Sequence, residues 1–163
     1  MKYKVSKSGK SNKTHKGFTL IELIVAMALS GILLAVAVPP FFQWRNNVNY
    51  RQTARQITSM LREARSFTIA NNVTHSVLIR PSTNSYRMLR NSMVLQDITA
   101  QSPVLIRGGA GGTLTTDISV TFNSNGTAVL TPTDGNIFIL DGSTQKFLIK
   151  VTPTGRISLQ QKY

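Results

Sequence analysis

The first feature of the chain is a nearly continuous apolar run over residues 18–38, in which Glu22 is the one charged residue. At a rise of 1.5 Å per residue, a helix over this run is roughly 30 Å long, the thickness of the hydrocarbon core of a bilayer. A helix satisfies its own backbone hydrogen bonds, so it is stable in lipid. The pattern therefore predicts a single membrane-spanning helix, with Gly31 and several alanines small enough to allow close helix–helix contact.

The helical pattern continues after the apolar run, but its character changes. Pro39-Pro40 is expected to kink the helix near the edge of the bilayer. Over residues 41–72, apolar residues recur every three or four positions, which indicates an amphipathic helix that packs on a globular domain. The expected apolar stripe consists of Val48, Ala54, Ile57, Leu61, Ala64 and Phe67 or Thr68. The arginines that lie mostly off this stripe are Arg45, Arg51, Arg55, Arg62 and Arg65.

After residue 72 the apolar period changes to two, which is typical of strands. The predicted strands cover residues 73–80, 85–90, 103–107, 118–122, 127–130, 137–140, 146–152 and 156–160. Asn125-Gly126 indicates a hairpin turn, and the glycine-rich segment 108–112 is expected to be a flexible loop. The predicted fold class is α+β, with a long kinked N-terminal helix, transmembrane and then amphipathic, followed by a mostly antiparallel β domain.

The distribution of charge adds information on membrane orientation, because much of the positive charge lies before the apolar run. The formal net charge is +13, but six lysines precede residue 17; without them, 13 basic residues stand against 6 acidic ones, or +7. A lysine-rich N-terminus stays cytoplasmic, which places the C-terminal domain in the periplasm, across the inner membrane. No small-residue cleavage site follows the end of the apolar run at Val38, so the helix should be retained. The chain has no cysteine, which excludes a disulfide scaffold, a thiolate metal site and a cysteine nucleophile.

Glu22 is unusual in a simple membrane anchor, because a carboxylate in the apolar zone costs about 3 kcal/mol and usually marks a function. Cleavage between Gly17 and Phe18 would create an amine of the opposite charge. Within one helix, that amine and Glu22 would be about 6 Å apart along the axis. On two staggered helices, the two groups could meet and neutralise each other.

Residues 17–22, with the sequence GFTLIE, resemble the signal sequence of type IV pilin-like proteins. The resemblance implies that a prepilin peptidase cleaves after Gly17, that Phe18 is methylated, and that Glu22 is the carboxylate used in assembly with other pilins or pseudopilins. The expected organisation is a cleaved leader (1–17), a transmembrane and assembly helix (18–40), an amphipathic helix (41–72) and a β domain (73–163).

The C-terminal half carries a second resemblance. The segments VTFNSNGTAVL and IKVTPTGRISL resemble the GspH/FimT group of minor pilins and pseudopilins, in which a β-sandwich follows the helix and a Gly-Arg pair opens the last strand. Gly155-Arg156 matches that pair. Several DNA-binding members have a second basic residue two places later, where this chain has Ser158. The resemblance implies an H-type minor pseudopilin of a type II secretion system, acting in protein secretion. The alternative is a FimT-like minor pilin that binds DNA for natural transformation.

No catalytic arrangement is visible in the sequence. His75 is the one histidine after the leader, and we expect it to be a surface or packing residue. The acidic residues show no paired spacing, and Asp134 and Asp141 fit turns better than a calcium loop. We therefore expect no enzyme activity, no cofactor and no metal.

The remaining candidate residues are basic. Lys146, Lys150, Arg156 and Lys162 lie late in the chain and could share an edge. Phosphate contacts by such residues would give salt-dependent binding of DNA. The other interpretation is a solvated basic surface that steers subunits or faces acidic lipid.

Overall fold

The computed structural model of the chain describes residues 17–162. Helix α1 covers Leu20–Asn71, so it remains helical through Pro39-Pro40. The chain divides into two compact units after Pro40. Most of the predicted leader lies outside the described residues. The predicted kink is an angle between the two units and stays a prediction.

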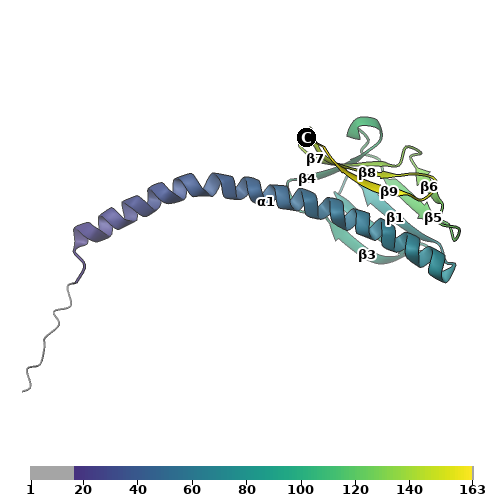
Figure 1. The fold of residues 1–163 in the computed structure, drawn as a ribbon, viewed down its shortest axis with the longest axis horizontal. Coiled ribbons are helices and arrows are strands. Elements are labelled where there is room, and N and C mark those ends of the chain that lie inside the picture. Colours follow the sequence, from purple (N-terminus) through teal and green to yellow (C-terminus); the bar gives the residue numbers. More distant parts are fainter. Residues whose placement is uncertain (1–16, 163) are drawn as a thin grey trace, which may run out of the picture. The chain divides into compact units, whose positions relative to one another are not determined.

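The unit that begins at Phe41 contains the later part of α1 and two antiparallel sheets (Figure 1). One sheet has the strand order β3-β2-β1-β5-β6 and the other has the order β4-β7-β8-β9. The strands are β1 (His75–Arg80), β2 (Ser85–Arg90), β3 (Met93–Thr99), β4 (Val104–Gly108), β5 (Ile118–Phe122), β6 (Ala128–Thr131), β7 (Asn136–Asp141), β8 (Thr144–Val151) and β9 (Ile157–Gln161). A short 3-10 helix, η1 (Ala110–Gly112), follows β4. The antiparallel α+β fold predicted from the sequence is confirmed.

One hydrophobic core joins α1 to both sheets. Val77 on β1 and Ile139 on β7 are both fully buried. They belong to the same cluster as Ile57 and Leu61 of α1, which are also fully buried. The buried positions of the strands and the stripe on the helix thus place apolar side chains from three layers in a single core.

The buried stripe of α1 begins at another residue than predicted, and it ends at one of the two predicted alternatives. Tyr50 is 1% exposed, whereas Val48 and Phe67 are 41% and 40% exposed. Thr68, the predicted alternative to Phe67, is buried. A stripe that starts at Tyr50 keeps the helical period through the predicted members Ala54, Ile57, Leu61 and Ala64, which are all buried. The assignment of Val48 to the core was wrong, because the buried stripe begins at Tyr50, two residues later.

Two further predictions need correction. Strand β3 was not predicted, because its side chains are mostly exposed on both faces and therefore show no apolar alternation. It forms the edge of its sheet through backbone pairing with β2. The glycine-rich segment was expected to be a flexible loop, but Gly108 ends β4 and η1 follows it. A Cβ atom at Gly112 would lie 3.1 Å from Phe138, so close packing, as well as flexibility, explains that glycine.

Candidate functional site

The helix α1 begins with a capped first turn that contains Glu22. The backbone N–H of Glu22 donates to Thr19 Oγ1 over 3.3 Å, and the N–H of Leu23 donates to the Thr19 carbonyl over 3.2 Å. Thr-x-x-Glu is the spacing of a capping box, and an acidic residue in the first turn interacts favourably with the helix dipole. Glu22 therefore has a local role in starting the helix. Its side chain is exposed and forms no ion pair within residues 17–162.

The apolar part of α1 is uncovered in the chain. Its large apolar side chains from Leu20 to Val38 are between 44% and 76% exposed, and Phe18 is 85% exposed. Within the described residues, α1 is the one helix long and apolar enough to cross a membrane, with a mean hydropathy of 2.5 over its most apolar 18 residues. So large an apolar surface indicates contact with lipid or with other chains.

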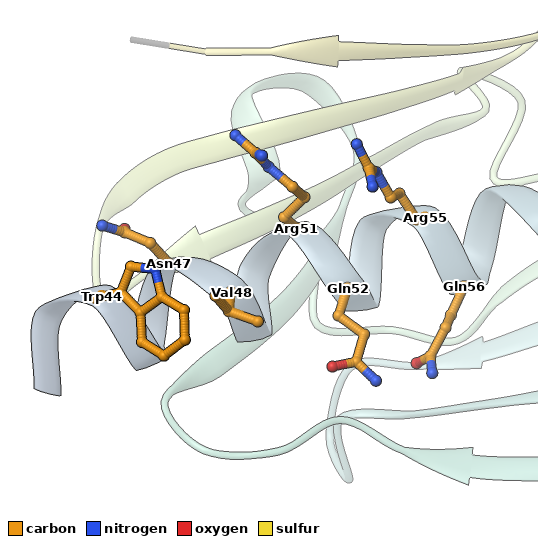
Figure 2. A pocket seen from close by; sticks show the side chains of 7 residues that line it. All are labelled: Trp44, Asn47, Val48, Arg51, Gln52, Arg55 and Gln56. Atoms are coloured by element: carbon orange, nitrogen blue, oxygen red, sulfur yellow. The ribbon is translucent and has the colours of Figure 1, made fainter. Parts of the chain in front are cut away.

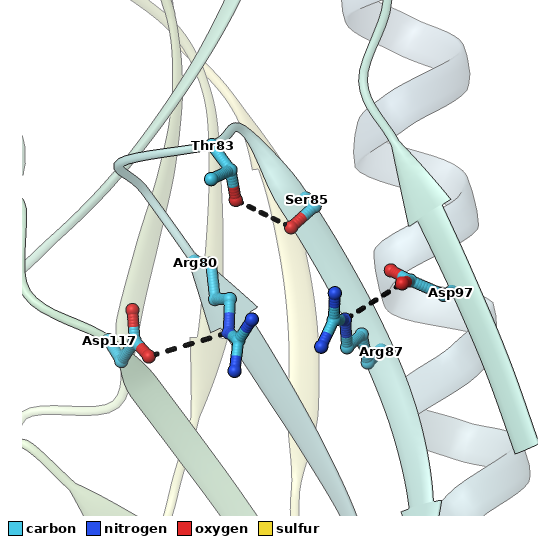
Figure 3. Close-up of polar contacts among 6 residues, drawn as sticks. All are labelled: Arg80, Thr83, Ser85, Arg87, Asp97 and Asp117. Carbon is cyan, nitrogen blue, oxygen red and sulfur yellow. Dashed lines mark hydrogen bonds and ion pairs between the residues drawn. The ribbon is translucent and has the colours of Figure 1, made fainter. Parts of the chain in front are cut away.

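Several arginines of the β domain are already engaged in contacts within the chain. Arg80 Nε lies 3.6 Å from Asp117 Oδ2, and Arg87 Nε lies 2.9 Å from Asp97 Oδ2 (Figure 3). Arg107 donates to the Pro81 carbonyl over 3.1 Å. These charges are partly neutralised or held by the backbone, so the available positive charge is concentrated elsewhere.

Four arginines follow one side of the buried stripe of α1: Arg51, Arg55, Arg62 and Arg65. At 3.6 residues per turn, they fall within a sector of roughly 80° around the helix axis. Figure 2 shows Arg51 and Arg55 pointing to one side of α1 and Gln52 and Gln56 pointing to the other. With Trp44, Asn47 and Val48, these four side chains line a hollow of about 380 Å³.

The first of two basic hollows, here the lysine hollow, lies between α1 and the strands β8 and β9. It measures about 320 Å³ and is lined by Asn47, Tyr50, Arg51, Thr144, Gln145, Lys146, Phe147, Gln161 and Lys162. The N–H of Lys162 donates to the Lys146 carbonyl over 2.8 Å, which holds the two lysines side by side. Lys146 Nζ also lies 3.8 Å from Asp141 Oδ2.

Tyr50 contributes a buried phenol to the lysine hollow. Its hydroxyl has no hydrogen-bond partner in the described residues. Burial is the main cause that raises the pKa of Tyr50 above its ordinary value, and the nearby Asp141 carboxylate raises it further. The hydroxyl therefore stays protonated at neutral pH, with the Asp141 carboxylate as a nearby acceptor.

The second, here the arginine hollow, lies between α1 and the turn that precedes β9. It measures about 490 Å³ and is lined by Arg62, Arg65, Ser66, Ile69, Thr154, Arg156 and Ile157. Arg65 Nε donates to the Gly126 carbonyl over 3.1 Å, which fixes its guanidinium at the edge of the hollow. None of the residues that line this hollow is acidic.

Two glycine turns support Arg65. Gly126 has φ 82° and Gly155 has φ 76°, both in the left-handed region that favours glycine. A Cβ atom at Gly155 would collide with the Gly126 carbonyl oxygen and would lie 3.0 Å from Arg65 Nε. The glycine before Arg156 is therefore required by the close approach of the two turns.

The structure divides the four late basic residues into separate places. Lys146 and Lys162 lie together in the lysine hollow, whereas Arg156 lies in the arginine hollow. Lys150 is exposed on β8, directly across from Ser158, and lines neither hollow. They do not form one continuous cluster; two of them instead share a hollow with Arg51, and one shares a hollow with Arg62 and Arg65.

His75 is a packing residue, one of the two roles expected for it. It is 3% exposed, its Nδ1 lies 2.7 Å from the Val73 carbonyl oxygen, and its ring centroid lies 5.8 Å from that of Phe67. No group of three or more His, Cys, Asp or Glu residues within 17–162 is arranged to hold a metal ion.

Comparison with known proteins adds a motif and a fold to this geometry. Residues 12–38 match the prokaryotic N-terminal methylation motif. The fold is similar to that of the type IV minor pilin FimU of Pseudomonas aeruginosa in two crystal forms, with 18% and 19% identity and TM-scores of 0.51 and 0.53. These matches cover 68% and 73% of this chain and 91% and 92% of FimU. The chain thus combines a prokaryotic N-terminal methylation motif with a fold similar to that of a type IV minor pilin.

A second structural likeness is to a protein of a secretion system. The chain is also similar to the minor pseudopilin EpsH of the Type 2 Secretion System of Vibrio cholerae, with 12% identity, a TM-score of 0.53, and coverage of 69% of this chain and 96% of EpsH. At such identities the likeness concerns the fold alone. The comparison with curated protein sequences finds no match.

Three residues of the hollows were not site candidates in the sequence: Arg51, Arg62 and Arg65. The sequence pattern identifies them only as polar positions off the apolar stripe. The spacing of the helix arginines did indicate that they share one side of α1. It could not indicate that this side faces the Gly155-Arg156 turn, because that depends on how the sheet packs on the helix.

Proposed function

We propose that this pilin-like protein is a minor subunit of a membrane-anchored filament, cleaved after Gly17 by a prepilin peptidase and methylated on Phe18. The observation that supports this proposal is the exposed apolar part of α1, which lies largely within the methylation motif. Burying one large apolar side chain gains about 2 kcal/mol. The inner membrane first, and the helices of neighbouring subunits later, would supply that burial.

Glu22 is the residue that would fix the position of the subunit in the filament. After cleavage, the amine of Phe18 on one subunit would attract the Glu22 carboxylate of another. Either charge alone is costly in an apolar environment, so the pair is favourable only when both groups are desolvated together. This requirement would set the axial register, while the apolar side chains of the helices provide the contact area.

The test is the entry of Glu22→Ala into filaments, compared with membrane insertion and N-terminal processing. We expect mass spectrometry to find the cleaved, methylated Phe18 in the membrane fraction, and the variant to be absent from sheared filaments. Thr19→Ala is the matched control for the helix cap, because it removes the hydroxyl that accepts from Glu22 but keeps the carboxylate. Glu63→Ala controls for the loss of one exposed carboxylate. Normal filament entry by Glu22→Ala would refute this role.

For the filament system, we propose an H-type pseudopilin of a type II secretion system, with the C-terminal domain in the periplasm. The reason is the incomplete basic pattern after Gly155-Arg156, where Ser158 stands in place of a second basic residue. Its partners would be other pseudopilins and the prepilin peptidase. Loss of secreted protein on deletion of the gene, with type IV pili intact, would support this assignment.

A second candidate function is that of a FimT-like minor pilin that binds DNA. The observation that favours it is the gathering of basic side chains in the lysine and arginine hollows. Binding of this kind would rest on phosphate contacts and would weaken steeply as salt is raised.

A further inference from the structure

We propose that the lysine hollow and the arginine hollow form one track for the phosphodiester backbone of a nucleic acid. In this arrangement the ligand lies along the arginine side of α1, and the helix arginines make contacts that Lys150 does not. The inference rests on the second candidate function and specifies the contacts that such binding would use.

The charge along the track is distributed as a linear polyanion requires. Three cationic residues line each hollow: Arg51, Lys146 and Lys162 line one, and Arg62, Arg65 and Arg156 line the other. From Arg51 to Arg65 the helix rises about 21 Å, and Arg55 lies between them on the same side. A small anion could occupy one hollow, but only an extended one contacts both.

Acidic residues are scarce along this track. Asp141 borders the lysine hollow, where it pairs with Lys146, and no acidic residue is among those that line either hollow. The other described carboxylates of the β domain include Asp97 and Asp117, which pair with Arg87 and Arg80 on the other sheet. The track therefore keeps most of its positive charge free for a ligand.

The side chains of the arginine hollow suit a phosphate group. A guanidinium presents paired N–H donors that match phosphate oxygens, and hydroxyl groups commonly add hydrogen bonds to the same oxygens. The hollow offers Ser66 and Thr154 beside its three arginines. Arg65 is held through Nε by the Gly126 carbonyl, which leaves its terminal nitrogens for a ligand. Pre-orientation of this kind lowers the entropy cost of binding.

Helix α1 also supplies the positive charge that strand β9 lacks at Ser158. Ser158 provides no positive charge after Arg156, and its side chain donates to the Lys150 carbonyl over 3.5 Å. Arg62 and Arg65 lie in the same hollow as Arg156, so they provide the additional cations from another element of the fold. The track can thus be complete although the sequence pattern around Gly155-Arg156 is not.

The experiment measures binding of a fluorescent 20-nucleotide oligo-dT to the full-length protein in non-ionic detergent, by anisotropy at 50 to 200 mM salt. We expect Arg62→Gln, Arg156→Gln and Lys162→Gln each to weaken binding at least threefold, and to lower the salt slope by about 0.7 for each phosphate group that the variant no longer binds. Lys150→Gln is the matched control, since it removes one exposed charge outside both hollows; its effect should stay below twofold. Unchanged far-UV circular dichroism and unfolding temperature confirm that each variant is folded.

Three results would overturn the inference. If the wild-type protein does not bind at 50 mM salt, both the track and the second candidate function are wrong. If binding occurs but Lys150→Gln weakens it as much as Arg62→Gln does, DNA binding stands and the track is wrong. If polyglutamate of equal charge competes as well as unlabelled oligo-dT, the hollows do not select phosphate and the ligand is an acidic peptide.

Discussion

Replacing Gly155 by alanine tests the close approach of the two turns that hold Arg65. Gly155 has φ 76°, and placing an L-residue in the left-handed region costs about 1–2 kcal/mol. The new Cβ atom would also collide with the Gly126 carbonyl oxygen, so the turns would have to separate. Separation breaks the 3.1 Å hydrogen bond from Arg65 Nε to that carbonyl, and such a charged bond contributes about 1.5–3 kcal/mol. The expected loss of stability is about 3–5 kcal/mol.

Gly142 provides a matched control for this substitution. It also has a positive φ, 57°, but a Cβ atom there would meet nothing within 4 Å. Gly142→Ala should therefore cost only the backbone term, about 1–2 kcal/mol. The difference between the two variants isolates the collision, because both share the strain of the left-handed region.

The measurement is urea unfolding of the full-length protein in non-ionic detergent, followed by far-UV circular dichroism. With a slope of about 2 kcal/mol per molar urea, we expect Gly155→Ala to lower the midpoint by roughly 2 M and Gly142→Ala to lower it by less than about 1 M. Equal slopes show that the unfolding transition itself is unchanged. If the two variants have the same midpoint, the turns do not approach as described, and Arg65 is not held by Gly126.

Two further predictions concern the core. Burial raises the pKa of Tyr86 to about 12, from about 10 in an unfolded chain. The neutral phenol, which donates to Gln56 over 2.6 Å, should therefore stabilise the fold fully below pH 10. About 2–3 kcal/mol should be lost as the pH rises from 10 to 12, a loss that Tyr86→Phe lacks in urea titrations. Ile57→Ala, at a fully buried position, should lower the free energy of unfolding by about 2–4 kcal/mol. The control Val129→Ala, at a position 56% exposed, should lower it by less than about 0.5 kcal/mol. Equal losses would place Ile57 outside the core.

The elements with a strong local pattern were predictable. The apolar run and the 3.6-residue period that follows it indicated the long helix, and alternation with glycine turns indicated eight of the nine strands found within residues 17–162. The missed strand, β3, is an edge strand with Met93 and Val94 exposed, so no buried face imposes an alternation on its sequence. The stripe of α1 was predicted to begin at Val48 instead of Tyr50, because the spacing of apolar residues alone does not indicate which side of a helix meets a sheet.

The candidate sites also differ in whether the sequence alone could reveal them. Glu22, Gly17 and Phe18 were visible as a motif, because their proposed roles depend on neighbours in the sequence and on one helical turn. The basic hollows were not visible. Arg62 and Arg156 are 94 positions apart in the numbering and lie together only because α1 packs beside the turn that opens β9.

The amino-acid sequence by itself determined the apolar segment, its single carboxylate and the order of helix and strands, because each depends on interactions between residues close in the chain. Tertiary packing alone decided which cations share a hollow and which remain apart, since the pairing of β8 with β9 and the seating of the sheets on α1 set those neighbours. Lys150 and Arg156 look equivalent in the sequence. The fold exposes one on a strand and places the other beside two helix arginines.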